Sequence, residues 1–185
     1  DHRDLHSFPT RRSSDLNMLT GSLPSMFSNM ADLSTLLVDK NQLSGELPPS
    51  MAALKALRTL NLRDNMLSGG IGVMSNFSSA VYMYFDRNNF TGPIPEDIGA
   101  LSSLQTFSAS VNHLNGTIPA SIGNLKELRQ LVIPTNHITG TIPSTISNLS
   151  QLEYLHLYRN ELDGTIPADI SRCRNTISFL LTKNK

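Results

Sequence analysis

Apolar residues recur along most of this chain at fixed distances in front of a series of asparagines. They stand eight, five and three residues before each asparagine, as Leu57, Leu60 and Leu62 do before Asn65. Residues two apart on an extended segment point to one side, and the residue between them points to the other. The pattern therefore predicts one short β-strand in front of each asparagine, with an apolar side and a polar side.

The asparagines themselves mark an internal repeat. They follow one another at intervals of 24 residues, with a single interval of 23: Asn17, Asn41, Asn65, Asn88, Asn112, Asn136, Asn160 and Asn184. A unit of this size cannot bury its apolar side alone, so we expect successive coils to stack and to pair their strands into a continuous parallel sheet. An amide side chain both donates and accepts hydrogen bonds. We therefore expect each asparagine to bridge the backbone of its own turn to that of the next coil.

The repeat has a recognisable consensus, L-x-x-L-x-L-x-x-N-x-L-x-G-x-I-P, which resembles the plant-type leucine-rich repeat. The element T-G-x-I-P, at 91–95 and 139–143, is typical of the plant subtype, and the runs SIGNL and TISNL resemble ectodomains of grass immune receptor kinases. The resemblance implies an α/β leucine-rich repeat solenoid, right-handed, with a parallel β-sheet on the concave face and short 3-10, helical and irregular segments on the convex side. It covers residues 17–185, in about seven coils. The cysteine pairs that normally cap such arrays are missing, so we expect an uncapped fragment.

The first sixteen residues do not share the repeat pattern. The stretch DHRDLHSFPTRRSSDL resembles the translation of a common short-read sequencing adapter. We therefore expect residues 1–16 to be a non-native, adapter-derived tail and to be disordered.

The composition excludes several classes of function. The 185 residues carry 15 basic and 15 acidic side chains, which argues against a nucleic-acid partner. The single cysteine, Cys173, cannot form an internal disulfide or a cysteine-based zinc site. No apolar run is long enough to cross a membrane, so we expect membrane attachment only through missing parts of a parent protein. No catalytic motif occurs, and we predict no enzymatic activity, metal or cofactor for this chain.

The polar side of the predicted sheet holds the candidate binding residues. All four tyrosines fall on outward positions, and rigid amphipathic aromatic side chains are favoured contact residues in interfaces. Tyrosine also suits exposed strand positions in the absence of any ligand, which is the alternative interpretation. The outward positions give this candidate ligand-binding set on the concave face: Tyr82, Tyr84, Arg87, Ser110, His113, Gln130, Val132, His137, Tyr154, His156 and Tyr158.

Charges and histidines on the same side form columns from coil to coil. Opposite signs alternate in two columns, which read Asp39, Arg63, Asp86 and Lys40, Asp64, Arg87. We interpret them as a ladder of cross-strand ion pairs. A neutral strip follows, formed by Ser110, Val111, Pro134 and Thr135. His113 and His137 share a further column, where they are a pH-sensitive pair, a fortuitous metal-binding pair or ordinary exposed histidines.

Four Asn-x-Ser/Thr sequons are candidate glycosylation sites: Asn76, Asn89, Asn115 and Asn148. Asn76 and Asn148 occupy the same slot of their coils, outside the apolar frame. This placement suits a glycosylated secretory protein, although a chain rich in Asn and Ser also generates sequons by composition.

The resemblance also implies a function. Proteins of this kind are extracellular ligand-recognition modules of plant receptor-like kinases or receptor-like proteins, in cell-surface signalling or defence. We therefore expect a peptide, glycan or protein ligand, a co-receptor with leucine-rich repeats, and a location at the extracellular face of the plasma membrane or in the apoplast. A Ser/Thr kinase domain would belong to the missing part of the parent. The alternatives are a soluble cell-wall protein of the polygalacturonase-inhibiting type and, more remotely, an intracellular scaffold of the same fold.

Overall fold

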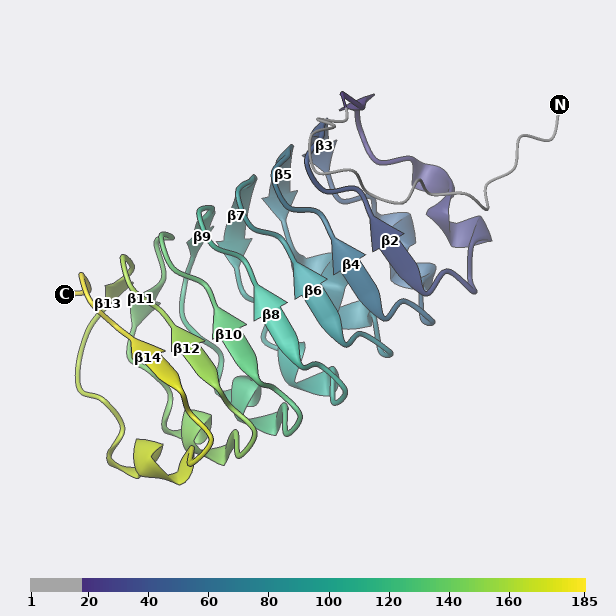
Figure 1. Cartoon of the computed structure of the whole chain (residues 1–185). Helices are drawn as coiled ribbons and strands as arrows, with labels where there is room; N and C mark the ends of the chain where they lie inside the picture. The colour runs from purple at the N-terminus through teal and green to yellow at the C-terminus, as the bar shows by residue number, and fades with distance from the viewer. Residues whose placement is uncertain (1–17) are drawn as a thin grey trace, which may run out of the picture.

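The computed structural model describes residues 18–185, which stack as successive coils of one solenoid (Figure 1). The expected adapter-derived tail, residues 1–16, and Asn17 lie outside the described residues. Each coil runs through a short strand, a tight turn, in most coils a second short strand, and a 3-10 helix before the chain enters the next coil. The leucine-rich repeat solenoid predicted from the sequence is confirmed.

The strands in front of the asparagines form one continuous parallel sheet on the concave face (Figure 1). Its seven strands lie side by side in chain order: β2 (Thr35–Leu37), β4 (Thr59–Asn61), β6 (Tyr82–Tyr84), β8 (Thr106–Ser108), β10 (Gln130–Val132), β12 (Tyr154–His156) and β14 (Ser178–Leu180). The register is strict, because Gln130 pairs with Thr106 on one side and with Tyr154 on the other. Equivalent residues of successive coils therefore form straight rows across the sheet.

A second set of strands follows the asparagines, and the sequence analysis did not predict it. Five pair as β1 (Thr20–Gly21), β3 (Gln42–Glu46), β5 (Met66–Gly70), β7 (Asn89–Pro93) and β9 (His113–Asn115), and two pair as β11 (Thr139–Gly140) and β13 (Glu161–Leu162). The expectation of one strand per coil is therefore wrong for most coils. The second strands form because, after each turn, the chain lies beside the equivalent segment of the adjacent coil. The backbone groups of the two segments then form hydrogen bonds with each other.

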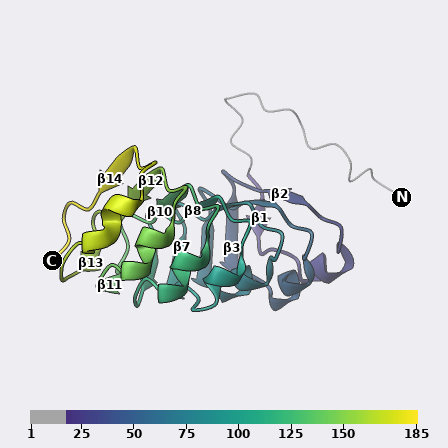
Figure 2. The same ribbon diagram turned by 90° about the horizontal axis from the view of Figure 1, so that it is seen from below.

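The convex side carries short 3-10 helices, stacked in a row when the molecule is viewed from below (Figure 2). They are η1 (Ser25–Asn29), η2 (Pro49–Ala53), η3 (Gly72–Asn76), η4 (Ile98–Ala100), η5 (Ala120–Asn124), η6 (Ser144–Asn148) and η7 (Ala168–Arg172). In most of them the residue before the first helical position is the proline of the repeat consensus. Within residues 18–185 all helical segments are of this type, which accounts for the helical part of the predicted fold.

The apolar frame fills the space between the sheets and the 3-10 helices. Leu57, Leu60 and Leu62 are each at most 1% exposed, and the equivalent residues of the central coils are buried to the same degree. Phe85 packs edge-on against Phe90 and Phe107, with ring centroids 5.6 and 6.1 Å apart. Burial on this scale is the main source of stability, since each fully buried Leu or Phe side chain contributes about 1.5–3 kcal/mol.

The asparagine side chains form a ladder of hydrogen bonds between coils. Asn112 Oδ1 accepts the backbone N–H of Phe90 at 3.0 Å, and Nδ2 donates to the carbonyls of Phe85 at 3.1 Å and Ala109 at 3.3 Å. The side chain thus reaches back to the preceding coil, whereas the sequence analysis expected the next one. The reason is that the backbone N–H of Asn112 already donates to Thr135 of the following coil, at 3.2 Å. Each such asparagine therefore links its own coil to both neighbours.

From Asn41 onward, the residue before each asparagine of the repeat adopts a left-handed backbone conformation, with φ between 53° and 61°. This turn ends the first strand and redirects the chain. At most positions a charged residue stands there, but Val111 and Thr135 are β-branched, with φ of 55° and 57°. A β-branched side chain in this region crowds its own backbone, which costs about 1–2 kcal/mol. Both residues belong to the neutral strip noted in the sequence.

We predict that Asn112→Asp lowers the free energy of unfolding by about 2–4 kcal/mol, because a carboxylate oxygen would face carbonyl oxygens that now accept hydrogen bonds from Nδ2. Urea denaturation measures this change. Asn115→Asp is the matched control, since Asn115 is exposed and its change should stay within about 0.5 kcal/mol. Equal losses at the two positions would contradict the role of the ladder.

We predict that Val111→Asn raises the free energy of unfolding by about 1 kcal/mol, because Asn tolerates the left-handed region better than a β-branched residue does. Val132→Asn serves as the control. It makes the same chemical change inside the regular strand β10 and should be destabilising. A lower stability of the Val111 variant, measured in the same denaturation experiment, would contradict the strain.

Candidate functional site

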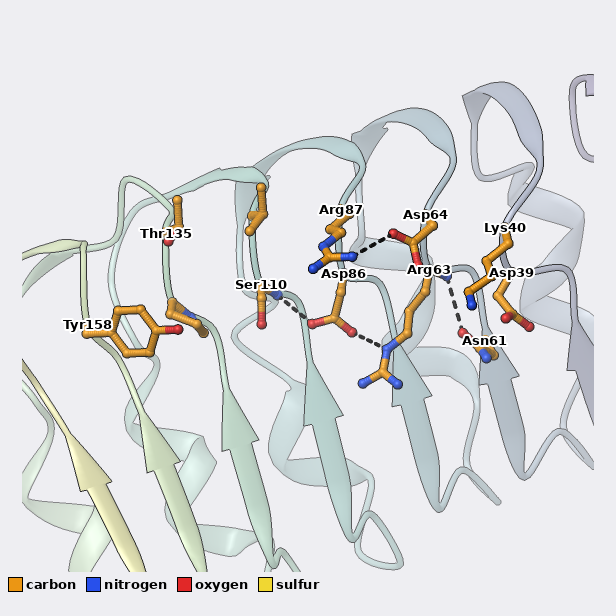
Figure 3. Close-up of a pocket in the computed structure, with 12 residues that line it drawn as sticks. Asp39, Lys40, Asn61, Arg63, Asp64, Asp86, Arg87, Ser110, Thr135 and Tyr158 are labelled. Atoms are coloured by element: carbon orange, nitrogen blue, oxygen red, sulfur yellow. Dashed lines mark hydrogen bonds and ion pairs between the residues drawn. The ribbon is translucent and has the colours of Figure 1, made fainter. Parts of the chain in front are cut away.

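A shallow groove of about 530 Å³ runs across the concave face, along the ends of the strands (Figure 3). The residues that line it come from six successive coils: Asp39, Lys40, Asn61, Arg63, Asp64, Asp86, Arg87, Ser110, Val111, Pro134, Thr135 and Tyr158. Most of them occupy the two positions just before the asparagines, where the chain turns out of the sheet. The in-register stacking aligns these positions and so creates the groove.

Two ion pairs occupy the charged half of the groove. Arg63 Nε lies 2.5 Å from Asp86 Oδ2, and Arg87 Nη1 lies 3.2 Å from Asp64 Oδ1. Both pairs connect the coil of β4 to the coil of β6, and Figure 3 shows them side by side. The cross-strand ion-pair ladder predicted from the sequence is confirmed at this junction.

Asp86 is held in the groove by three hydrogen bonds. Its carboxylate accepts hydrogen bonds from the Ser108 hydroxyl at 2.6 Å, from the Ser110 backbone N–H at 2.9 Å, and from Arg63. Burial raises the pKa of Asp86, but these hydrogen bonds and the charge of Arg63 outweigh burial and hold the pKa below its ordinary value. The carboxylate therefore stays ionised and serves to fix Arg63 in place.

Arg63 is also held from a second direction. Its guanidinium carbon lies 4.0 Å from the ring centroid of Tyr84, within the range of a cation–π contact. Asn61 Oδ1 accepts the backbone N–H of Arg63 at 3.2 Å. The guanidinium is thus positioned before any ligand arrives.

The other half of the groove carries no formal charge. Ser110, Val111, Pro134, Thr135 and Tyr158 line it, and Val111 is 47% exposed while Pro134 is buried. An exposed apolar side chain in a strained turn, beside a rigid proline and a tyrosine ring, provides a surface for apolar contact.

Two pairs of outward side chains lie beside the groove. Tyr82 and Tyr84 on β6, and Tyr154 and His156 on β12, lie on either side of strands β8 and β10. The Tyr154 and His156 rings meet edge-on at 5.9 Å, and the His156 and Tyr158 rings are 6.5 Å apart. His156 Nε2 also lies 2.8 Å from Ser178 Oγ, and burial lowers the pKa of His156. The aromatic groups therefore lie on both sides of β8, whose outward side chains Thr106 and Ser108 are buried.

The structure brings together most of the candidate binding residues. Arg87, Ser110 and Tyr158 line the groove itself, and Gln130 and Val132 lie half-buried on β10, between the two pairs of aromatic side chains. Asn61 was missed by the sequence analysis, although it occupies an outward strand position. Arg63 and Asp86 were assigned a structural role only. Their place in the groove follows from contacts between coils that the linear pattern does not specify.

His113 and His137 do not lie on the concave sheet, contrary to expectation. His113 begins β9 of the five-stranded sheet and His137 precedes β11, because the left-handed turn before each asparagine carries the following residue out of the first strand. Their rings stack at 5.9 Å with an interplanar angle of 12°. His137 Nδ1 lies 3.3 Å from Glu161 Oε1, and Lys185 Nζ lies 3.1 Å from Glu161 Oε2. These residues form a separate exposed row on the flank of the solenoid.

The four sequon asparagines lie outside the seven-stranded sheet. Asn76 and Asn148 end η3 and η6, while Asn89 and Asn115 lie on β7 and β9. The side chains of three are exposed, and Asn76 is half-buried with its amide bonded to Val73 O at 3.3 Å.

Metal sites and membrane-spanning helices were also considered for residues 18–185. The described part of the chain has no group of three metal-ligating side chains, and it has no helix long and apolar enough to cross a membrane. Cys173 is buried in the core, where burial raises the pKa of its thiol, as expected of a packing residue.

We predict that Asp86→Asn lowers the free energy of unfolding by about 1–3 kcal/mol at pH 7, because a neutral amide replaces a carboxylate that accepts three hydrogen bonds. The pKa of Asp86 is depressed in the folded state, so its stabilisation is complete above the ordinary carboxyl pKa and is lost as the pH falls through the folded value. The difference between variant and wild type should therefore shrink below about pH 4. A difference that stayed constant down to pH 2, in denaturation curves, would contradict this account.

Comparisons with known proteins agree with this architecture. Residues 103–125 and 151–173 match the family model described as Leucine Rich Repeat. No curated protein sequence matches the chain. The ectodomain of the Arabidopsis thaliana membrane receptor kinase GASSHO1/SCHENGEN3, in complex with CASPARIAN STRIP INTEGRITY FACTOR 2, is 34% identical over 91% of this chain and 20% of that chain, with a TM-score of 0.89.

Two further plant receptors are also similar to this chain. The plant peptide hormone receptor RGFR1, in complex with RGF2, is 33% identical over 91% of this chain and 27% of that chain, with a TM-score of 0.88. The Arabidopsis receptor kinase HAESA, in complex with the peptide hormone IDA and the co-receptor SERK1, is 27% identical over 91% and 32%, with a TM-score of 0.69. The chain thus spans 20% to 32% of these three structures. It carries leucine-rich repeats and folds as a leucine-rich repeat solenoid similar to parts of plant receptor ectodomains.

Proposed function

We propose that this chain is the ligand-recognition part of an extracellular plant receptor with leucine-rich repeats, and that its concave face binds a peptide. The observation that carries the proposal is the groove that crosses six coils on the concave face, built on a sheet whose rows are fixed by the register. A rigid surface loses little conformational entropy on binding, and Tyr side chains provide large contact areas at low entropic cost.

A peptide suits this site better than a globular protein or a glycan. The groove is long, shallow and open, and it crosses six coils, which fits an extended chain. The similar receptor RGFR1 is described as a peptide hormone receptor, and HAESA is bound to a peptide hormone. These similarities support a peptide ligand for this chain as well.

The same reasoning extends to location and partners. We place the protein at the extracellular face of the plasma membrane, where the four sequon asparagines would be available for glycosylation. A second protein with leucine-rich repeats, acting as co-receptor as SERK1 does for HAESA, is the expected partner. A kinase domain, in the receptor-like kinase case, would belong to the remainder of the parent protein. The chain itself supplies recognition and no catalysis.

A selection of random dodecapeptides displayed on phage, against the full chain, tests the proposal. We expect selected peptides to lose affinity about tenfold or more with Tyr154→Ala or Tyr158→Ala, because Tyr158 lines the groove, Tyr154 lies beside it in the same coil, and aromatic contact residues contribute strongly to binding. The matched control is Met26→Ala, which removes a large side chain, 68% exposed, from η1 on the convex side. Peptides bound equally by the tyrosine variants and the wild type, measured by biolayer interferometry, would refute binding on the concave face.

A further inference from the structure

The second strands of the coils lie on the flank of the solenoid and form two sheets instead of one. β7 pairs with β9, and β11 pairs with β13, but β9 and β11 do not pair although they follow one another in the stack (Figure 1). In the paired coils, the glycine four residues after the repeat asparagine lies opposite an apolar residue of the next coil, as Gly92 lies opposite Leu114. The equivalent glycine at the interruption is Gly116.

The interruption results from one missing hydrogen bond. Gly116 O accepts the backbone N–H of Thr139 at 2.7 Å, which is one of the two bonds that a parallel pair requires. Within residues 18–185 the N–H of Gly116 has no hydrogen-bond partner, so the other bond is not made. Backbone N–H groups in folded proteins are nearly always paired. The free nitrogen of Gly116 therefore sets this position apart from the equivalent glycines.

The residue before this nitrogen is Asn115, which ends β9. Its side chain is exposed and makes no hydrogen bond to the described part of the chain. It is also the only asparagine of the 185 residues that is followed by glycine. Glycine has no Cβ, so no side chain of its own hinders the approach of its nitrogen to the preceding side chain.

The other sequon asparagines are followed by nitrogens that are already hydrogen-bonded. The N–H of Phe90, which follows Asn89, donates to Asn112 Oδ1 at 3.0 Å. The N–H groups that follow Asn76 and Asn148 close the last turns of η3 and η6, at 3.0 and 3.1 Å from their carbonyl acceptors. A nitrogen held in this way reaches the preceding side chain only after its hydrogen bond breaks.

We propose that Asn115 is a site of spontaneous deamidation in the folded protein. The nitrogen of Gly116 attacks Cγ of Asn115, and the bond from Cγ to Nδ2 breaks. The proton of the attacking nitrogen passes through solvent to Nδ2, which leaves as ammonia, and a five-membered succinimide ring remains. Water then opens the ring at either carbonyl and gives aspartate or isoaspartate. The attack is intramolecular, so its rate depends on whether the two groups are free to meet.

Deamidation changes the flank of the solenoid in three ways. It removes the amide to which a glycan of this sequon would be attached, so a deamidated molecule cannot carry a glycan at Asn115. It places a carboxylate on the same side of β9 as the exposed ring of His113. Isoaspartate also adds one carbon to the backbone, at the residue that pairs with Pro93. The reaction is independent of any ligand in the groove.

Peptide mapping by mass spectrometry tests the proposal on the full, unglycosylated chain, produced in bacteria and incubated in mildly alkaline buffer. We expect Asn115 to deamidate at least about tenfold faster than Asn89, the matched control, which is also exposed but is followed by a bound N–H. Part of the product should be a substrate for isoaspartate methyltransferase, because the ring opens at either carbonyl. Equal rates at the two asparagines, or a product without isoaspartate, would overturn the proposal.

A comparison of the folded chain with the urea-unfolded chain separates the effect of the fold from that of the local sequence. Unfolding frees every backbone nitrogen, so folding should slow the reaction about a hundredfold or more at Asn89 but about tenfold or less at Asn115. An equal slowing at both positions would show that the fold also blocks cyclisation at Asn115, and would refute the proposal. Asn115→Gln should abolish the mass shift of this peptide, because a longer side chain does not close the five-membered ring.

Hydrogen exchange followed by NMR measures the free nitrogen directly. The N–H of Gly116 should exchange faster than that of Gly92, which lies in the paired part of the flank. Equal protection of the two glycines would contradict the missing hydrogen bond from which the reactivity of Asn115 follows.

Discussion

The hydrogen bonds of the asparagine side chains are the constraint on which the rest of this structure depends. Each turn between the two strands of a coil buries backbone carbonyl and N–H groups, and unpaired groups of this kind are costly. One amide per coil satisfies both kinds of group and links them to the preceding coil, as Asn65 does through Leu43 N–H at 3.0 Å and Val38 O at 2.9 Å. The same contact fixes the register, and the register in turn aligns the residues that form the groove.

The sequence was sufficient to predict the solenoid because its signals are local and repeated. Leu128, Leu131 and Ile133 stand at the same distances before Asn136 as their equivalents do in the other coils. These three side chains are buried, as expected. The second strands were not predicted, because the segments that begin at Gln42 and Met66 do not show a regular alternation of apolar and polar residues. Their pairing results from the stacking of the coils, so a pattern within one coil does not reveal it.

The candidate site was predictable only as a surface. Outward positions follow from the strand period, which is why Tyr84, Tyr154 and Tyr158 were identified. The chemistry of the groove depends on contacts between coils more than twenty residues apart, as when Ser108 and Ser110 satisfy Asp86. The predicted position of His113 was wrong for a related reason. Val111 adopts a left-handed backbone conformation, and the residues after it therefore lie outside the first strand.

The in-register pairing of equivalent residues has a consequence for how such a protein changes over generations. Residue 130 pairs with residues 106 and 154, which lie one 24-residue unit away on either side. Unequal recombination that duplicates or deletes one 24-residue unit would preserve the core and the amide ladder while altering the length of the groove by one strand spacing. The length of the groove can therefore change in a single genetic event while the packing between the remaining coils is preserved.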